Sequence, residues 1–129
     1  ELKISDRVEF LGYQEGEPLQ KLYRTADAFV LPTREDCFGL VLLEAMCASL
    51  PIISSKYADG ARDLVSDGEN GSIINPEDVD GFAEAIQKAA AGDMASVMGK
   101  KSYEKAHEFS FEQVSKGCIA AFSYVLSQK

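Results

Sequence analysis

The sequence predicts an α/β protein whose parallel sheet is covered by helices on both faces. Short apolar runs alternate with amphipathic ones along the chain. The expected strands, such as "AFVL" (28–31) and "PII" (51–53), are apolar along their whole length, which is typical of strands buried on both faces. With 129 residues and 46% hydrophobic residues, the chain has the size and composition of one globular domain.

The first half of the chain alternates strands with helices. The run "RVEFLG" (7–12) is expected to form a strand that Gly12 ends, and Pro18 suits the first turn of the helix that follows. The next strand is rich in aromatic and β-branched residues and stops at Pro32. The expected bounds are strands 7–12, 27–33 and 51–55, and helices 17–26 and 38–49.

The second half contains one more strand and is otherwise helical. The turn residues of "DGENG" (67–71) separate a short helix from this strand. Apolar residues at spacings of three and four then predict helices, and Ser110 with Gln113 forms a capping-box pair at the start of the last one. The expected bounds are helix 61–66, strand 72–76, and helices 78–91, 93–109 and 111–126.

Charge and cysteine content disfavour several classes of function. The net charge of -8 argues against nucleic acid and anionic membranes as partners, because both require a basic patch. The three cysteines show no Cys-x-x-Cys spacing, so neither a disulfide framework nor a metal site is expected. Cys47 and Cys118 are expected to be small core residues. Without a signal peptide or an apolar run of about 18 residues, the expected compartment is the cytoplasm.

Two carboxylates, Asp36 and Glu44, flank the apolar run in "REDCFGLVLLEAM" (34–46). Asp36 is expected in the loop after a strand and Glu44 in the first turns of the next helix, so both can face the crevice where parallel sheets bind ligands. A helix N-terminus between them offers amides to a phosphate, and the glycine there allows close approach. These amides belong to Phe38, Gly39 and Leu40. The arrangement suits a sugar nucleotide; the alternative is that both acids are solvated helix charges.

The stretch "ADAFVLPTREDCFGLVLLEAMCASLPIISS" (26–55) resembles the donor-binding part of retaining glycosyltransferases of the GT-B fold, group 1 or family 4. The family pattern runs from a strand through Pro-Ser/Thr and Glu-x-Phe-Gly to a helix with Glu-Ala-Met/Leu-Ala, then a small residue, Gly-x-Pro and a strand. The resemblance continues through "RVEFLG" and through residues 59–86, and covers essentially the whole chain. It implies a Rossmann-like parallel sheet flanked by helices, as in a GT-B C-terminal domain.

The resemblance also implies roles for individual residues. Asp36 takes the first acidic position of the family's E-x7-E signature and would contact hydroxyls of the donor sugar, while Glu44 takes the second and would hold the ribose hydroxyls. The implied substrate is a UDP- or GDP-sugar, with no cofactor, no metal ion and no catalytic residue in this chain. Gly12 and Tyr13 would lie near the base. The implied donor-binding residues are Asp36, Cys37, Phe38, Gly39, Leu40, Glu44, Gly12 and Tyr13.

Three departures from the family pattern affect these expectations. Asp36 stands where Glu is usual, and Ser49 stands where a glycine is usual. The family's first two strands, with their basic phosphate-binding element, and its acceptor-binding N-terminal domain do not precede Glu1. Residues 1–129 are therefore expected to be a partial C-terminal nucleotide-sugar-binding domain that is inactive alone.

Missing strands would leave open edges in the sheet. One of three remedies is expected: strands 7–12 and 27–33 pair directly, another copy supplies the pairing, or the missing strands come from a separate segment. The last helix, 111–126, is expected to pack on a missing domain or a partner. Self-association through the open edges or through this helix is therefore a further expectation.

The implied function is the donor-binding portion of a retaining glycosyltransferase that moves a sugar from a nucleotide sugar to a glycan or lipid-linked acceptor. The acceptor would bind the missing N-terminal domain, and the parent protein would work in the cytoplasm or at the inner face of the membrane. The alternatives are a non-catalytic GT-B-like binding or assembly module, and a GT-B epimerase or phosphorylase, because a fold does not fix a reaction.

Overall fold

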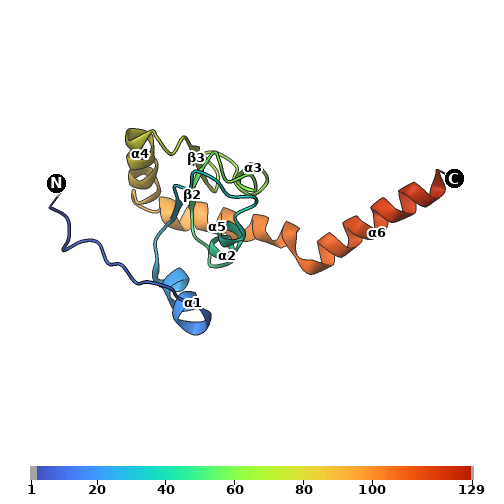
Figure 1. The fold of residues 1–129 in the computed structure, drawn as a ribbon, viewed down its shortest axis with the longest axis horizontal. Helices are drawn as coiled ribbons and strands as arrows, with labels where there is room; N and C mark the ends of the chain where they lie inside the picture. The colour runs from blue at the N-terminus through green and yellow to red at the C-terminus, as the bar shows by residue number, and fades with distance from the viewer. Residues whose placement is uncertain (1–2, 129) are drawn as a thin grey trace.

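The computed structural model describes residues 3–128. Helices and strands alternate from α1 to α4, and three helical segments complete the chain (Figure 1). The elements are α1 (Gly16–Thr25), β1 (Phe29–Leu31), α2 (Leu40–Cys47), β2 (Ile52–Ser55), α3 (Ala61–Leu64), β3 (Gly71–Ile74), α4 (Val79–Ala89), α5 (Met94–Ala106), the 3-10 helix η1 (His107–Phe109) and α6 (Phe111–Ser127). The predicted helices and the last three predicted strands are confirmed, with small shifts at their ends.

The three strands form one parallel sheet in the order β1-β2-β3. The predicted α/β class with a parallel sheet is therefore confirmed. Gly71 opens β3 directly opposite Ile52, and a Cβ atom at position 71 would overlap the carbonyl oxygen of Ile52. Glycine is thus required for β3 to approach the central strand this closely.

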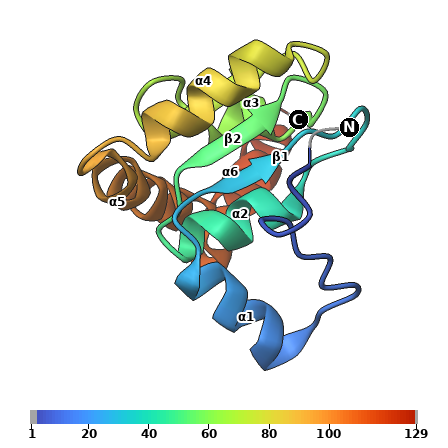
Figure 2. The ribbon, with the colours of Figure 1, turned by 90° about the vertical axis from the view of Figure 1, so that its left-hand side faces the viewer.

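Helices cover both faces of the sheet (Figure 2). Because successive side chains of a strand point to opposite faces, Ile52 and Ile53 of β2 serve two different cores. Ile52 packs with buried residues of α2 and α3, and Ile53 packs with buried residues of α4 and α5. Every residue of β2 is buried, whereas β1, at the edge of the sheet, is half-buried.

Asn70 connects the amino end of β3 to α3 and α5. Its side chain is buried, and its Oδ1 accepts a hydrogen bond from the Ser66 N–H (2.7 Å) while its Nδ2 donates to the Leu64 carbonyl (3.1 Å). The Asn70 carbonyl accepts two further bonds, from the Ile52 N–H (3.0 Å) and the Ser102 hydroxyl (3.2 Å). One buried residue therefore fixes the turn before β3 and joins it to α3, β2 and α5.

A Schellman motif ends α2 and turns the chain into β2. The Ser49 N–H donates to the Met46 carbonyl (2.9 Å), and the Leu50 N–H donates to the Ala45 carbonyl (3.2 Å). Ser49 itself is left-handed, with φ of 61°. The family pattern usually has glycine at this position, and the backbone here has the conformation that favours glycine.

Residues 7–12 do not form a strand, so that prediction is wrong. The segment runs as an irregular, exposed chain, and Phe10 is 94% exposed. A strand is stabilised by its hydrogen bonds to a neighbour, and within residues 3–128 the outer edge of β1 carries no paired strand. Direct pairing of 7–12 with β1 is therefore not the remedy for the open edge, and the other two remedies remain predictions.

The last helix, α6, extends away from the sheet (Figure 1) and none of its described residues is buried. Its start is capped as predicted, since the Ser110 hydroxyl accepts the Gln113 N–H (3.4 Å). Its apolar residues, including Phe111 and Phe122, are exposed. Among residues 3–128, no helix is long and apolar enough to cross a membrane.

The prediction that Cys47 and Cys118 are core residues is wrong, because both are exposed. Cys118 lies on α6, whose apolar stripe has no packing partner in the described chain. Cys47 faces the groove between α1 and α2 instead of the sheet. An apolar helix position predicts burial only if another element covers that face of the helix.

The Asn70→Ala substitution should lower the free energy of unfolding by about 2–4 kcal/mol, because it leaves the Ser66 N–H and the Leu64 carbonyl without their partner. Urea unfolding measures this loss. The matched control is Asn75→Ala, which should change stability by less than about 0.5 kcal/mol, because within residues 3–128 the Asn75 side chain accepts a single long bond, from the Glu77 N–H (3.4 Å). Equal losses in the two variants would contradict the role given to Asn70.

The Ser49→Gly substitution should stabilise the protein by about 0.5–1 kcal/mol, because glycine adopts φ of 61° without the steric cost of a Cβ atom. The same urea experiment measures the gain. Ser49→Ala keeps the Cβ atom and should give no gain. A stabilisation by alanine equal to that by glycine would show that the hydroxyl, and not the backbone, sets the cost.

Candidate ligand-binding site

The loops that follow β1 and β2 are hydrogen-bonded to each other at the carboxyl edge of the sheet. The Asp36 N–H donates to the Tyr57 carbonyl (3.1 Å), and the Asp59 N–H donates to the Asp36 carbonyl (3.1 Å). These bonds form a parallel bridge between Asp36 and Ala58 beyond the ends of the strands. Asp36 is thus fixed at the edge where open α/β sheets bind ligands.

A glycine allows these two loops to approach each other. Gly60 lies just before α3, and a Cβ atom on it would overlap the carbonyl oxygen of Phe38. The chain between β1 and α2 therefore packs directly on the backbone between β2 and α3. Gly60 stabilises the same arrangement as the bridge from Asp36 to Ala58.

The Asp36 side chain folds back onto the start of α2. Its Oδ1 accepts a hydrogen bond from the Phe38 N–H (3.0 Å), so one of the three amides predicted to face a phosphate is already paired. Gly39 is the N-cap of α2, with φ of 75°. No acceptor among residues 3–128 pairs with the N–H of Gly39 or of Leu40. Two amides at the positive end of the helix dipole thus have no acceptor in this part of the chain; Leu40 is exposed, whereas Gly39 is buried.

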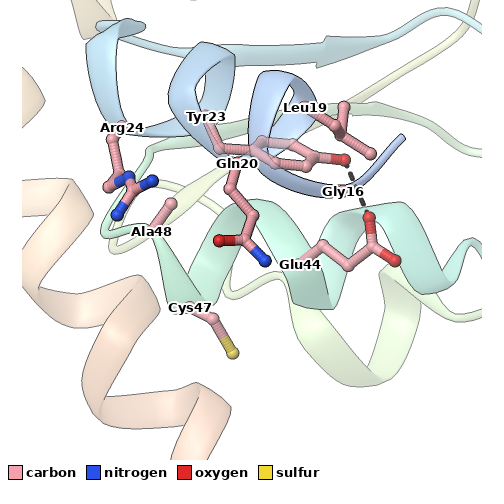
Figure 3. A pocket seen from close by; sticks show the side chains of 8 residues that line it. All are labelled: Gly16, Leu19, Gln20, Tyr23, Arg24, Glu44, Cys47 and Ala48. Atoms are coloured by element: carbon pink, nitrogen blue, oxygen red, sulfur yellow. Dashed lines mark hydrogen bonds between the residues drawn. The ribbon is translucent and has the colours of Figure 1, made fainter. Parts of the chain in front are cut away.

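Glu44 lies one helical turn after Leu40, beside a groove between α1 and α2 (Figure 3). The Tyr23 hydroxyl donates a hydrogen bond of 3.0 Å to its Oε2. The groove has a volume of about 480 Å³. Its lining residues are Gly16, Leu19, Gln20, Tyr23, Arg24, Glu44, Cys47 and Ala48.

Tyr23 was not among the residues singled out from the sequence. It lies 21 positions before Glu44, and only the packing of α1 on α2 brings the two together. Its ring also packs on Phe29 of β1, with ring centroids 5.8 Å apart and an interplanar angle of 45°. The available sequence signal is its spacing from Gly16 and Leu19, which places all three on one face of α1.

The environment of Tyr23 raises the pKa of its phenol to about 12. Burial is the largest cause, because it disfavours the charged phenolate; the hydrogen bond to Glu44 and the charge of that carboxylate act in the same direction. Tyr23 therefore stays protonated, and remains a hydrogen-bond donor, across the physiological pH range.

The other predicted site residues lie in loops. Cys37 is exposed between β1 and α2. Gly12, with φ of 65°, and Tyr13 precede α1 and do not line the groove. Tyr13 is exposed, and its hydroxyl donates to Glu15 (3.0 Å). The structure thus places Asp36 just before α2, two unpaired amides at its start and Glu44 one turn later. The groove beside Glu44 is lined neither by Asp36 nor by the residues that carry these amides. Gly12 and Tyr13 lie on the segment leading into α1.

Comparison with known proteins identifies the family. Residues 1–106 match the family described as "Glycosyl transferases group 1". The chain belongs to this family. The resemblance found in residues 26–55 is therefore confirmed.

Curated members of the family extend beyond this chain. The D-inositol 3-phosphate glycosyltransferase of Mycolicibacterium smegmatis is 32% identical over 127 residues, which are 98% of this chain and 29% of that protein. The protein of the same name from Mycobacterium marinum is 30% identical over 125 residues, 95% of this chain and 27% of that protein. The chain thus spans less than a third of the length of these relatives.

Solved structures of glycosyltransferases share the fold. Sucrose-phosphate synthase from Thermosynechococcus elongatus superimposes with a TM-score of 0.81 and 30% identity, over 98% of this chain and 32% of that one. The pneumococcal O-GlcNAc transferase GtfA, solved in complex with UDP and GlcNAc, has a TM-score of 0.75 and 23% identity, over 94% of this chain and 25% of that one. The predicted GT-B fold is confirmed.

The Gly60→Ala substitution should push the two edge loops apart, because its Cβ atom would overlap the Phe38 carbonyl oxygen. We expect a loss of stability of about 1–3 kcal/mol and faster hydrogen exchange at the amides of Asp36 and Asp59. Exchange measured by NMR reports both amides. In the control, Gly117→Ala on α6, the added Cβ atom meets open space and these amides should exchange as before. Unchanged exchange in Gly60→Ala would disprove the close approach.

Proposed function

We propose that this chain is the donor-binding part of a retaining glycosyltransferase that moves a sugar from a UDP- or GDP-sugar to a glycan or lipid-linked acceptor. The carrying observation is the order of groups along α2: Asp36 before the helix, two unpaired amides at its start, and Glu44 one turn later. The family membership supports this proposal, and GtfA was solved with UDP and GlcNAc. The nucleotide sugar is the substrate, and no cofactor or metal ion is proposed.

The diphosphate would bind at the start of α2. The N–H groups of Gly39 and Leu40 would donate to its oxygens, and the helix dipole would favour its charge. The chain carries a net charge of -8, which opposes the binding of an anion, so cations must contribute. Arg34 and Lys56 lie in the loops after β1 and β2, and the basic element of the family pattern would add to them in a longer protein.

Each carboxylate would bind one sugar of the ligand, the ribose or the donor sugar. Glu44 can accept hydrogen bonds from the ribose hydroxyls, since its side chain is exposed beside the groove. Asp36 can accept from the donor sugar through the oxygen that Phe38 does not use. Carboxylates accept such bonds strongly because they are charged. Asp36 and Glu44 therefore have separable effects, one on the transferred sugar and one on the nucleotide.

Binding to the full-length protein tests this division. Glu44→Ala should weaken both free UDP or GDP and the matching nucleotide sugar by about 10- to 100-fold, the effect of losing a charge-assisted hydrogen bond. Asp36→Ala should weaken the nucleotide sugar and leave the free nucleotide within about threefold. Isothermal titration calorimetry measures each affinity. Glu84→Ala, an exposed acid on α4, removes the same charge and serves as the control.

Two outcomes would contradict the proposal. If Glu44→Ala binds every nucleotide as the unmodified protein does, the donor does not use α2. If the nucleotide sugar binds with the expected pattern but the full-length protein transfers no sugar to any glycan or lipid-linked acceptor, the non-catalytic binding module is the better assignment.

A further inference from the structure

The groove beside Glu44 is formed by one face of each of two helices. Gly16, Leu19, Gln20 and Tyr23 recur at spacings of three and four along α1, and Glu44, Cys47 and Ala48 do so along α2. Figure 3 shows the Tyr23 hydroxyl reaching across the groove to the Glu44 carboxylate. This hydrogen bond links a side chain of α1 to a side chain of α2.

Tyr23 is held in place independently of Glu44. It belongs to the partly buried residues packed against the larger core cluster, and its ring lies against Phe29. Phe29 is itself fixed in β1, where its N–H donates to the Pro51 carbonyl (3.0 Å). The phenol is therefore a stationary donor. Its pKa of about 12 keeps the proton in place at neutral pH.

Glu44 is the exposed partner of this pair. Its side chain is exposed, and a free glutamate on a helix surface populates several rotamers. The hydrogen bond engages Oε2, and no donor among residues 3–128 engages Oε1. One oxygen is thus used to fix the carboxylate, and the other is available to a ligand hydroxyl.

We infer that Tyr23 is a positioning residue that holds the Glu44 carboxylate ready for a ribose hydroxyl, so that the groove discriminates ribonucleotides from deoxyribonucleotides. This inference rests on the proposed function and concerns the same site. Fixing the acceptor before binding removes the cost of ordering it during binding. A ligand without the ribose hydroxyl cannot bond to the ordered carboxylate, so the ordering raises the affinity of ribonucleotides and leaves that of deoxyribonucleotides unchanged.

The test compares Tyr23→Phe with the unmodified full-length protein. Phenylalanine keeps the ring that packs on Phe29 and removes only the hydroxyl. Calorimetry with UDP and GDP, each beside its 2′-deoxy and 3′-deoxy analogues, gives the ratio of deoxy to ribo dissociation constants. We expect Tyr23→Phe to weaken the ribonucleotide about 5- to 10-fold and to lower this ratio at least about threefold.

Two further variants separate positioning from a structural effect. In a Glu44→Ala background, adding Tyr23→Phe should change the affinity by less than about twofold, because the group that it positions is gone. The matched control is Tyr103→Phe on α5, which makes the same chemical change in a tyrosine packed on His107. It should leave both the affinity and the ratio unchanged.

Each contrary result has a distinct meaning. If Glu44→Ala lowers the ratio but Tyr23→Phe does not, the inference is wrong and the proposed function stands. If Tyr23→Phe weakens ribo and deoxy ligands equally, its effect is structural and the inference is also wrong. If Glu44→Ala leaves the ratio unchanged, or no nucleotide binds, the ribose assignment of the proposed function fails, and the inference fails with it.

Discussion

The parallel pairing of β2 with both of its neighbours is the constraint on which the rest of the structure depends. β2 is buried throughout, supplies one isoleucine to each core, and meets β3 at a glycine that has no space for a side chain. The same pairing continues past the strands as the bridge between Asp36 and Ala58. The loop that carries Asp36 is therefore hydrogen-bonded to the loop after β2 in continuation of the sheet.

The alternating elements could be predicted from the sequence because their signals are local. The apolar run 51–55 predicts β2, and the glycine-rich turn 67–71 predicts the start of β3. Asp36 could likewise be placed after a strand and Glu44 on the next helix. Residues 7–12 have an equally good strand pattern, yet a strand also needs a neighbour, which the pattern does not supply.

Contacts between distant segments could not be predicted in the same way. Cys47 is exposed because α1 and that face of α2 enclose a groove. Close packing of the two helices at this point would bury the thiol. The bond from Tyr23 to Glu44 depends on the same crossing of α1 over α2. Periodicity assigns residues to a face of a helix, but the angle between two helices decides which side chains on those faces meet.

The two carboxylates of the site each accept one hydrogen bond from a donor within the chain. Asp36 has one oxygen engaged by the Phe38 N–H, and Glu44 has one oxygen engaged by the Tyr23 hydroxyl. Each acid is thus oriented by an internal donor and keeps its second oxygen for another partner. In a chain with a net charge of -8, an anionic ligand gains little from long-range attraction. Its affinity must then come from short-range groups, and acceptors that are ordered before the ligand arrives make the most of each hydrogen bond.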